Sequence, residues 1–207
     1  MKKRLTKLLL AVLLLTVCVV GLSVAAQAAE PVKYGGLMVE TDVAEACSYD
    51  AGNWILTFKK PGTYRVSMAA DATPVKASLV VDAADVILQL DRVDITACDE
   101  EAALTLHYDT TIEAIGTSRL TGSDGASYEL EPAISGLGKT MIFQGDRLLV
   151  IGGKGISGAR VAAGIQASVE MRSGTLYAQG GVGSKMFGMD GKPGGCGITA
   201  QTQREPG

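Results

Sequence analysis

The chain has 207 residues, of which 47% are hydrophobic and 20% are charged, and its formal net charge is −3. Residues 1–28 have the pattern of a secretion signal: basic residues at 2–7, an apolar stretch at 8–24 and a small-residue cleavage site at 26–28. Removing this segment takes away four basic and no acidic residues, so the net charge moves from −3 to −7. An acidic exported chain is poorly suited to bind nucleic acid or anionic lipid. The sequence has no second apolar run long enough to predict a membrane span. We therefore expect a secreted or extracellular surface protein.

Few residues of the kinds that build zinc sites or catalytic centres follow the leader. The cysteines Cys47, Cys98 and Cys196 are far apart and odd in number, which argues against a disulfide framework but leaves a single pair open. There is no Cys-x-x-Cys pair and only one histidine, which argues against the usual zinc sites. That residue, His107, lies in an alternating run that is more typical of a polar strand position than of a catalytic histidine. We therefore assign no catalytic residue and favour a protein that is not an enzyme.

The predicted elements after the leader are a cap followed by short β-strands. Residues 29–60 form the cap segment, in which Val39–Cys47 is either a short helix or an irregular stretch and Trp54–Phe58 is a strand. From there on, short runs rich in Val, Ile, Leu and Thr are separated by Gly, Asp and Ser. The runs lie at 63–67, 77–81, 86–90, 93–96, 104–106, 111–115, 141–143, 148–151, 168–171 and 175–178. Nothing after residue 60 keeps a helical period, so the mature domain is predicted to be nearly all β.

These short strands repeat with a fixed period. The small-apolar pairs 103–104, 133–134, 164–165 and 197–198 recur at intervals of 30, 31 and 33 residues, and Gly116, Gly145 and Gly174 are spaced by 29. Three short strands in each unit of about 30 residues predict a parallel β-solenoid of about three to four coils over residues 61–200. A β-sandwich would need longer strands and hairpin signals and would not need a fixed period.

The repeats also resemble a known family. Gly62-Thr-Tyr-Arg-Val66, the run from Ala84 to Thr96, the Ala/Gly-Ile pairs and the Gly-Gly corners are similar to the carbohydrate-binding β-helix domains of bacterial surface proteins. The resemblance covers about residues 61–200. It implies a right-handed parallel β-helix like that of polysaccharide lyases, and binding of plant cell-wall polysaccharide and of calcium. The sequence departs from the family pattern in having few coils and in stopping about one strand into its fourth repeat.

Aromatic and basic side chains are the candidate sugar-binding residues. Tyr108, Tyr128 and Tyr177 fall at predicted strand ends or corners, where an exposed ring can stack on a sugar. Trp54 and Phe143 are expected to pack inside the coils or to cover a cap. Arg119 and Arg147 follow equivalent corner glycines, so adjacent coils can bring them together to bind an acidic sugar. The alternative for these arginines is a role as surface charges paired with neighbouring acids.

The candidate metal site is an acidic stretch between residues 82 and 101. Calcium prefers six to eight oxygen ligands, and carboxylates at adjacent coil corners can supply them. Asp99, Glu100 and Glu101 share a predicted turn and are the first choice, and Asp91 and Asp94, which flank a predicted strand, are the second. The alternative is that all five are solvated turn residues of an acidic secreted protein.

Together these features predict a non-catalytic module that binds polysaccharide, of an acidic plant cell-wall type, with calcium as a candidate cofactor. The alternatives are a structural or adhesin-like surface protein without sugar specificity and a remnant of a polysaccharide lyase. Residues 201–207 follow the last repeat as a tail in which no capping run is visible, so an incomplete final coil is expected. An open coil end also predicts end-to-end self-association.

Overall fold

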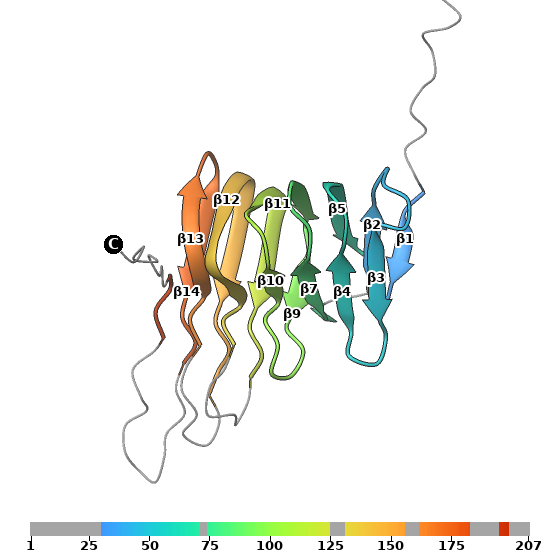
Figure 1. Ribbon diagram of the computed structural model, residues 1–207. Coiled ribbons are helices and arrows are strands. Elements are labelled where there is room, and N and C mark those ends of the chain that lie inside the picture. Colours follow the sequence, from blue (N-terminus) through green and yellow to red (C-terminus); the bar gives the residue numbers. More distant parts are fainter. Residues whose placement is uncertain (1–29, 71–73, 125–130, 156–161, 183–194, 199–207) are drawn as a thin grey trace, which may run out of the picture.

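The chain folds into strands that stack as a parallel β-solenoid (Figure 1). The computed structural model describes residues 30–70, 74–124, 131–155, 162–182 and 195–198. These residues contain fourteen strands and no helix. The strands are β1 (Val32–Tyr34), β2 (Leu37–Glu40), β3 (Cys47–Asp50), β4 (Ile55–Phe58), β5 (Gly62–Met68), β6 (Val75–Lys76), β7 (Ser78–Val81), β8 (Val86–Asp91), β9 (Asp94–Thr96), β10 (Leu104–Leu106), β11 (Thr110–Thr121), β12 (Ile134–Ile151), β13 (Ile165–Met171) and β14 (Thr175–Gln179). The all-β solenoid predicted from the sequence is thereby confirmed.

Each coil contributes strand segments to three faces. Face A consists of β4, β7, β10 and the first residues of β12 and β13, and face B consists of β5, β8, the first half of β11, the middle of β12 and the end of β13. Face C consists of β6, β9, the second half of β11, the end of β12 and β14. All of these neighbours pair in parallel, which is why a short segment on one face continues directly onto the next.

The register between coils follows the sequence repeat. Leu104 pairs with Ile134, Ile134 pairs with Ile165, and an isolated parallel bridge joins Ile165 to Ile198. The small-apolar pairs recognised in the sequence therefore occupy one position in successive coils. Residues about 30 apart in sequence become neighbours at the spacing of adjacent strands, about 4.8 Å.

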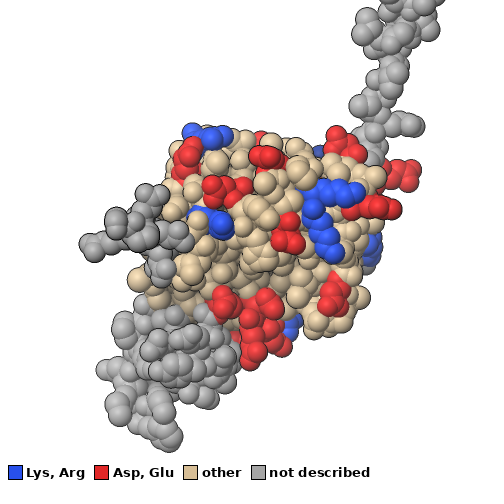
Figure 2. Space-filling model, viewed as in Figure 1, with Lys and Arg blue, Asp and Glu red and all other residues tan. Residues whose placement is uncertain are grey.

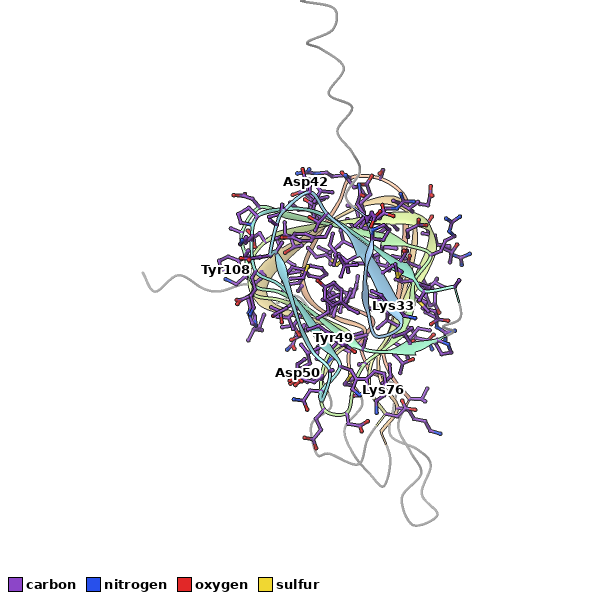
Figure 3. The ribbon with its side chains drawn as sticks, turned by 90° about the vertical axis from the view of Figure 1, so that its right-hand side faces the viewer. Lys33, Asp42, Tyr49, Asp50, Lys76 and Tyr108 are labelled. Atoms are coloured by element: carbon purple, nitrogen blue, oxygen red, sulfur yellow. The ribbon has the colours of Figure 1, made fainter. Side chains whose placement is uncertain are left out.

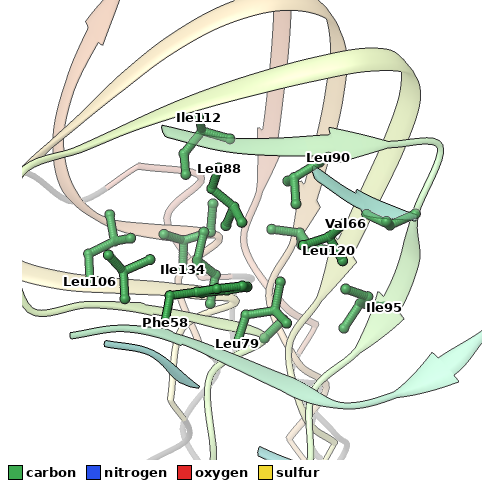
Figure 4. Packing of buried hydrophobic residues seen from close by; sticks show 14 of the residues in the cluster. Phe58, Val66, Leu79, Leu88, Leu90, Ile95, Leu106, Ile112, Leu120 and Ile134 are labelled. Carbon is green, nitrogen blue, oxygen red and sulfur yellow. The ribbon is translucent and has the colours of Figure 1, made fainter. Parts of the chain in front are cut away.

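The interior of the solenoid is filled by stacked apolar side chains (Figure 4). On face A, Leu56, Leu79, Leu104, Ile134 and Ile165 lie in one row and are fully buried. Side chains alternate between the two sides of a strand, so every second residue of each segment points into this core. Burial of these rows is the main favourable contribution to folding.

Aromatic residues fill the wider parts of the core. Phe58 and Tyr64 are fully buried, with ring centroids 4.8 Å apart and the rings tilted. The Tyr64 hydroxyl donates a hydrogen bond to the Lys60 carbonyl oxygen over 2.7 Å, which satisfies its polar end. Phe143 is also fully buried, as the sequence predicted.

The corner between faces B and C depends on residues with positive φ. Gly116, Gly145 and Gly174 occupy it in successive coils with φ of 68°, 104° and 84°. Arg92 takes the same corner one coil earlier with φ of 51°, and a Cβ on Gly116 would meet its side chain. Pairing of β11 with β12 resumes after this corner with a register shift between Ala114 and Thr117, so the predicted strand 111–115 extends into the twelve-residue β11.

Two antiparallel hairpins cover the N-terminal end of the stack (Figure 3). Strand β1 pairs with β2, which lies beside β5, and β3 pairs with β4. The helical alternative for Val39–Cys47 is therefore wrong. In β2 the apolar residues Leu37 and Val39 are buried alternately with half-buried neighbours, which is the two-residue period of a strand. Residues 41–46 form an irregular connection to β3, in which Ala46 is buried.

The last described coil has an apolar and open side. Met171 and Ile198 are each 48% exposed, although both align with buried residues of the preceding coil. End-to-end association of the chain stays a prediction. Cys47, Cys98 and Cys196 are all free, so no pair of them forms a disulfide.

The glycine corner leads to a stability prediction. An alanine at Gly145 would adopt an unfavourable φ, and its Cβ would overlap the Ala114 carbonyl oxygen of the neighbouring coil. We expect Gly145→Ala to lower the free energy of unfolding by about 2 kcal/mol or more, measured by urea denaturation. Gly52→Ala, at an exposed turn whose φ is not positive, is the control and should cost far less. Equal losses in the two variants would contradict the role of the corner.

Candidate functional site

Three of the sequence-predicted sugar-binding residues lie on face C. Arg119 is in β11, Arg147 in β12 and Tyr177 in β14, which are successive coils. Arg119 pairs with Leu149, which in turn pairs with Tyr177, so these residues form one row across the coils. Arg147 lies in the parallel row that begins with Thr117 and ends with Thr175. Stacking thus brings together residues from three separate repeats.

The side chains of these two rows point outward. Their neighbours along the strands, Leu120, Leu148 and Val150, are fully buried, so the alternation of a strand places Arg119 and Arg147 on the outer surface. Both arginines are exposed. The two Cα atoms are separated by one strand spacing and two residues, a distance of about 8 Å.

No described residue forms an ion pair or side-chain hydrogen bond with Arg119 or Arg147. Within the described part of the chain, the predicted alternative, in which these arginines pair with neighbouring acids, therefore finds no ion pair, although Asp94 is the register neighbour of Arg119 on β9. Tyr177 is 50% exposed, and its hydroxyl donates a hydrogen bond to Gln179 Oε1 over 3.2 Å. That bond directs the hydroxyl group toward Gln179, two residues further along β14. Among the described residues, the arrangement combines two guanidinium groups that form no ion pair with one aromatic surface, which suits a ligand that carries carboxylates on a sugar backbone.

The remaining predicted tyrosines do not join this group. Tyr108 follows β10 at the corner between faces A and B, and it is 43% exposed. Figure 3 shows it on the opposite side of the coil cross-section from Lys76, which belongs to face C. Tyr128 lies outside the described residues.

The acidic candidates are divided between different environments. Asp91 is only 6% exposed, and its Oδ2 accepts hydrogen bonds from Arg65 Nε and Nη2 at 3.2 and 2.6 Å. Its Oδ1 lies 3.0 Å from Arg92 Nε as an ion pair without a well-aligned hydrogen bond. Asp91 raises the pKa of Arg65 through this bond and is part of a structural cluster at the end of β8. Asp94 lies in β9 beside Arg119, on another face.

The first-choice acids lie in the loop that follows β9. Asp99 Oδ1 is 2.9 Å from Lys76 Nζ, and Glu100 has φ of 65°. Acidic and basic side chains are interspersed on the side shown in Figure 2, and the densest cluster of one sign there is acidic. In the described ranges no group of three or more His, Cys, Asp or Glu residues is placed so that it could hold a metal ion. Calcium binding therefore stays a prediction.

Chelation tests the calcium prediction directly. If Asp99, Glu100 and Glu101 hold a structural calcium ion, treatment with EDTA should lower the melting temperature by several degrees and added calcium should restore it. Circular dichroism at 218 nm, about the β-sheet minimum, is the measurement. Magnesium at the same concentration is the control, because it requires a tighter octahedral site. An unchanged melting temperature would exclude a structural calcium ion.

Trp54 forms a second candidate site that the sequence interpretation missed. It was expected to be packed inside the coils or over a cap, yet 47% of its surface is exposed. It lines a cleft of about 530 Å³ together with residues of the loop after β9. The lining residues are Gly52, Asn53, Trp54, Ile55, Lys76, Cys98, Asp99 and Glu101. A signal for this position was present, since Asp50-Ala-Gly-Asn53 is a turn sequence and places the next residue outside the core.

The turn before Trp54 is held by one carboxylate. Asp50 Oδ1 accepts hydrogen bonds from the backbone N–H groups of Gly52 and Asn53 at 2.9 and 3.2 Å, and Asp50 Oδ2 accepts one from Asn53 Nδ2 at 2.8 Å. On the other side, the Trp54 carbonyl oxygen accepts a hydrogen bond from the backbone N–H of Ser78 at 3.0 Å. The backbone at Trp54 is thus fixed on both sides, with φ of 60°.

His107 has a surface role. Its Nδ1 lies 3.1 Å from Asp82 Oδ1, and both side chains are about half exposed. This pair joins neighbouring coils at the end of face A, where β10 stacks on β7. His107 was predicted as a polar strand position, and it lies directly after the end of β10.

Comparison of the chain with family models, with curated proteins and with solved structures finds no match. The resemblance to carbohydrate-binding β-helix domains is therefore supported in its fold, and the family itself stays a prediction. The described residues include no helix long and apolar enough to cross a membrane.

The turn at Asp50 gives a pH prediction with one spectroscopic reporter, since Trp54 is the single tryptophan. Hydrogen bonds, first that of the Asn53 side chain, lower the pKa of Asp50 below its ordinary value of 3.8. Because the pKa of Asp50 is lowered in the folded chain, its stabilisation of the turn is fully present above the ordinary pKa. This stabilisation is lost as the pH falls through the lowered pKa. We expect the Trp54 emission maximum to shift only below about pH 3.8.

Asp50→Ala should show this shifted emission already at neutral pH, because the turn has lost its acceptor. Asp82→Asn, on face A, is the matched control and should keep the wild-type emission. Circular dichroism separates a local change at the turn from global acid unfolding. Wild-type emission from Asp50→Ala at neutral pH would contradict the role assigned to this carboxylate.

Proposed function

We propose that this protein is a non-catalytic module that binds acidic polysaccharide on face C. The observation that carries the proposal is the convergence of Arg119, Arg147 and Tyr177, from three successive coils, on one outer surface. A guanidinium group without an acidic partner is a strong binding group for a carboxylate, because its hydrogen bonds are charge-assisted and can be bidentate. An exposed aromatic ring beside it can pack on the apolar side of a sugar.

The shape of the surface supports a polymer rather than a small molecule. The rows run across coils, so equivalent positions repeat along the solenoid axis at about 4.8 Å. Threonines accompany the arginines: Thr117 and Thr175 flank Arg147, and Thr121 follows Arg119. Their hydroxyl groups can donate and accept hydrogen bonds with sugar hydroxyls. A repeating ligand can therefore use a repeating surface.

The expected location follows from the leader-like residues 1–28, and we propose that the module acts in the extracellular space or at the cell surface. Calcium is proposed as an accessory in this function, since it can bridge carboxylates of the protein and of an acidic glycan. An adhesive surface protein without sugar specificity is the main alternative, and binding experiments distinguish the two.

The test is the binding of polygalacturonate to the mature protein by isothermal titration calorimetry. Arg119→Gln and Arg147→Gln should each weaken binding by about tenfold, which corresponds to about 1.4 kcal/mol for a lost charge-assisted hydrogen bond. Binding should also weaken as salt rises, because the contact is largely electrostatic.

Arg172→Gln is the matched control. Arg172 is as exposed as a typical surface arginine but pairs with Glu170, 3.0 Å away, at the end of β13 and away from face C. Its loss should leave the affinity unchanged. Failure of the wild-type protein to bind polygalacturonate, or an equal effect of all three substitutions, would contradict the proposal.

A further inference from the structure

The cleft beside Trp54 is separate from the arginine rows and has the opposite charge. It lies between the turn that joins β3 to β4 and the loop after β9, whereas Arg119, Arg147 and Tyr177 lie along β11, β12 and β14. Its charged lining residues are Lys76, Asp99 and Glu101, which give it a net negative charge.

Only one of the two acids in the cleft has a cationic partner. Lys76 Nζ lies 2.9 Å from Asp99 Oδ1, and this pair neutralises one carboxylate. Within the described part of the chain, no residue forms an ion pair or a side-chain hydrogen bond with Glu101. Burial raises the pKa of the Cys98 thiol, so this group stays uncharged near neutral pH. Among the described residues, Glu101 therefore contributes the uncompensated charge of the cleft.

The cleft also contains an aromatic surface on a fixed backbone. Trp54 is 47% exposed, while its carbonyl oxygen accepts a hydrogen bond from Ser78 and the preceding turn is tied by Asp50. A ring presented in this way loses little backbone entropy when a ligand packs on it. Tryptophan is also the aromatic residue that attracts cations most strongly. At about 530 Å³ the cleft is large enough for a sugar unit.

We propose that this cleft binds a protonated amino sugar, with Trp54 against the sugar and Glu101 beside its ammonium group. The Asn53 side chain, which also lines the cleft, offers an amide oxygen to a sugar hydroxyl. The same negative charge that attracts an ammonium group repels a uronate, so the cleft and the surface around Arg119 and Arg147 select different glycan chemistries. The inference extends the proposed glycan-binding function but uses another set of residues.

Two oligosaccharides with the same backbone test the charge selection. The probes are a glucosamine hexamer and an N-acetylglucosamine hexamer, compared at about pH 5.5, where the free amines are protonated and carboxylates are ionised. We expect the glucosamine hexamer to bind at least about fivefold more tightly, and to change the emission of Trp54. Equal affinities for the two hexamers would overturn the role of charge.

Substitutions locate the site. By calorimetry, Glu101→Gln should reduce the preference for the free amine to near unity, and Trp54→Ala should weaken binding of the glucosamine hexamer about tenfold. Trp54→Tyr, which keeps an aromatic ring, should retain most of the affinity and guards against a folding defect in the alanine variant. The controls are Tyr108→Ala, at an exposed ring on another side, and Glu170→Gln, at an exposed acid on β13.

The outcomes separate this inference from the proposed function. Polygalacturonate should bind without changing Trp54 emission. Arg119→Gln should weaken the binding of polygalacturonate but not the binding of the glucosamine hexamer. Unchanged affinity of Trp54→Ala for the glucosamine hexamer would overturn the cleft as its site even if face C binds acidic polymer. Loss of polygalacturonate binding alone would overturn the proposed function and leave the cleft intact.

Discussion

In-register parallel hydrogen bonding between successive coils is the constraint on which the rest of the structure depends. Each strand segment pairs with the equivalent segment of the next coil, so Leu104, Ile134 and Ile165 occupy one position at three levels. A shift of one residue would turn every core side chain outward, because a strand alternates its two sides. The apolar rows and the hydrogen-bonded register therefore stabilise each other.

The same constraint determines what the surface can be. Outward positions form rows just as inward positions do, so Arg119 acquires Leu149 and then Tyr177 as neighbours although about 30 residues separate each from the next. A surface of this kind presents side chains at a regular spacing and suits an extended polymer. The cleft at Trp54 is different, because it lies between a hairpin turn and a corner loop and holds a single aromatic residue beside unlike charges.

At the corners and at the N-terminal cap, the backbone departs from the regular parallel strands of the repeat. At the corner between faces B and C, glycines adopt positive φ and let neighbouring backbones approach closely, whereas Arg92 occupies that corner at a cost of about 1–2 kcal/mol in backbone energy. Asp91 beside it pairs with both Arg65 and Arg92, which helps to hold the strained arginine in place. At the N-terminal end, the antiparallel hairpins β1–β2 and β3–β4 end the parallel stack.

The sequence by itself determined the repeat, the all-β class and the stacked rows. The reason is that a period of about 30 residues with three short apolar runs can be recognised from the order of the residues alone. It also predicted Arg119, Arg147 and Tyr177 as sugar-binding residues, and that role stays a prediction. Their convergence on face C, and the separation of Tyr108 from them, required the tertiary structure, because the face on which a residue lies depends on where each coil turns its corners. Trp54 was expected inside the coils or over a cap, whereas the structure leaves it exposed in a cleft between the Asp50 turn and the loop after β9. Contacts between a hairpin and a distant loop follow no period, so only the folded chain decided them.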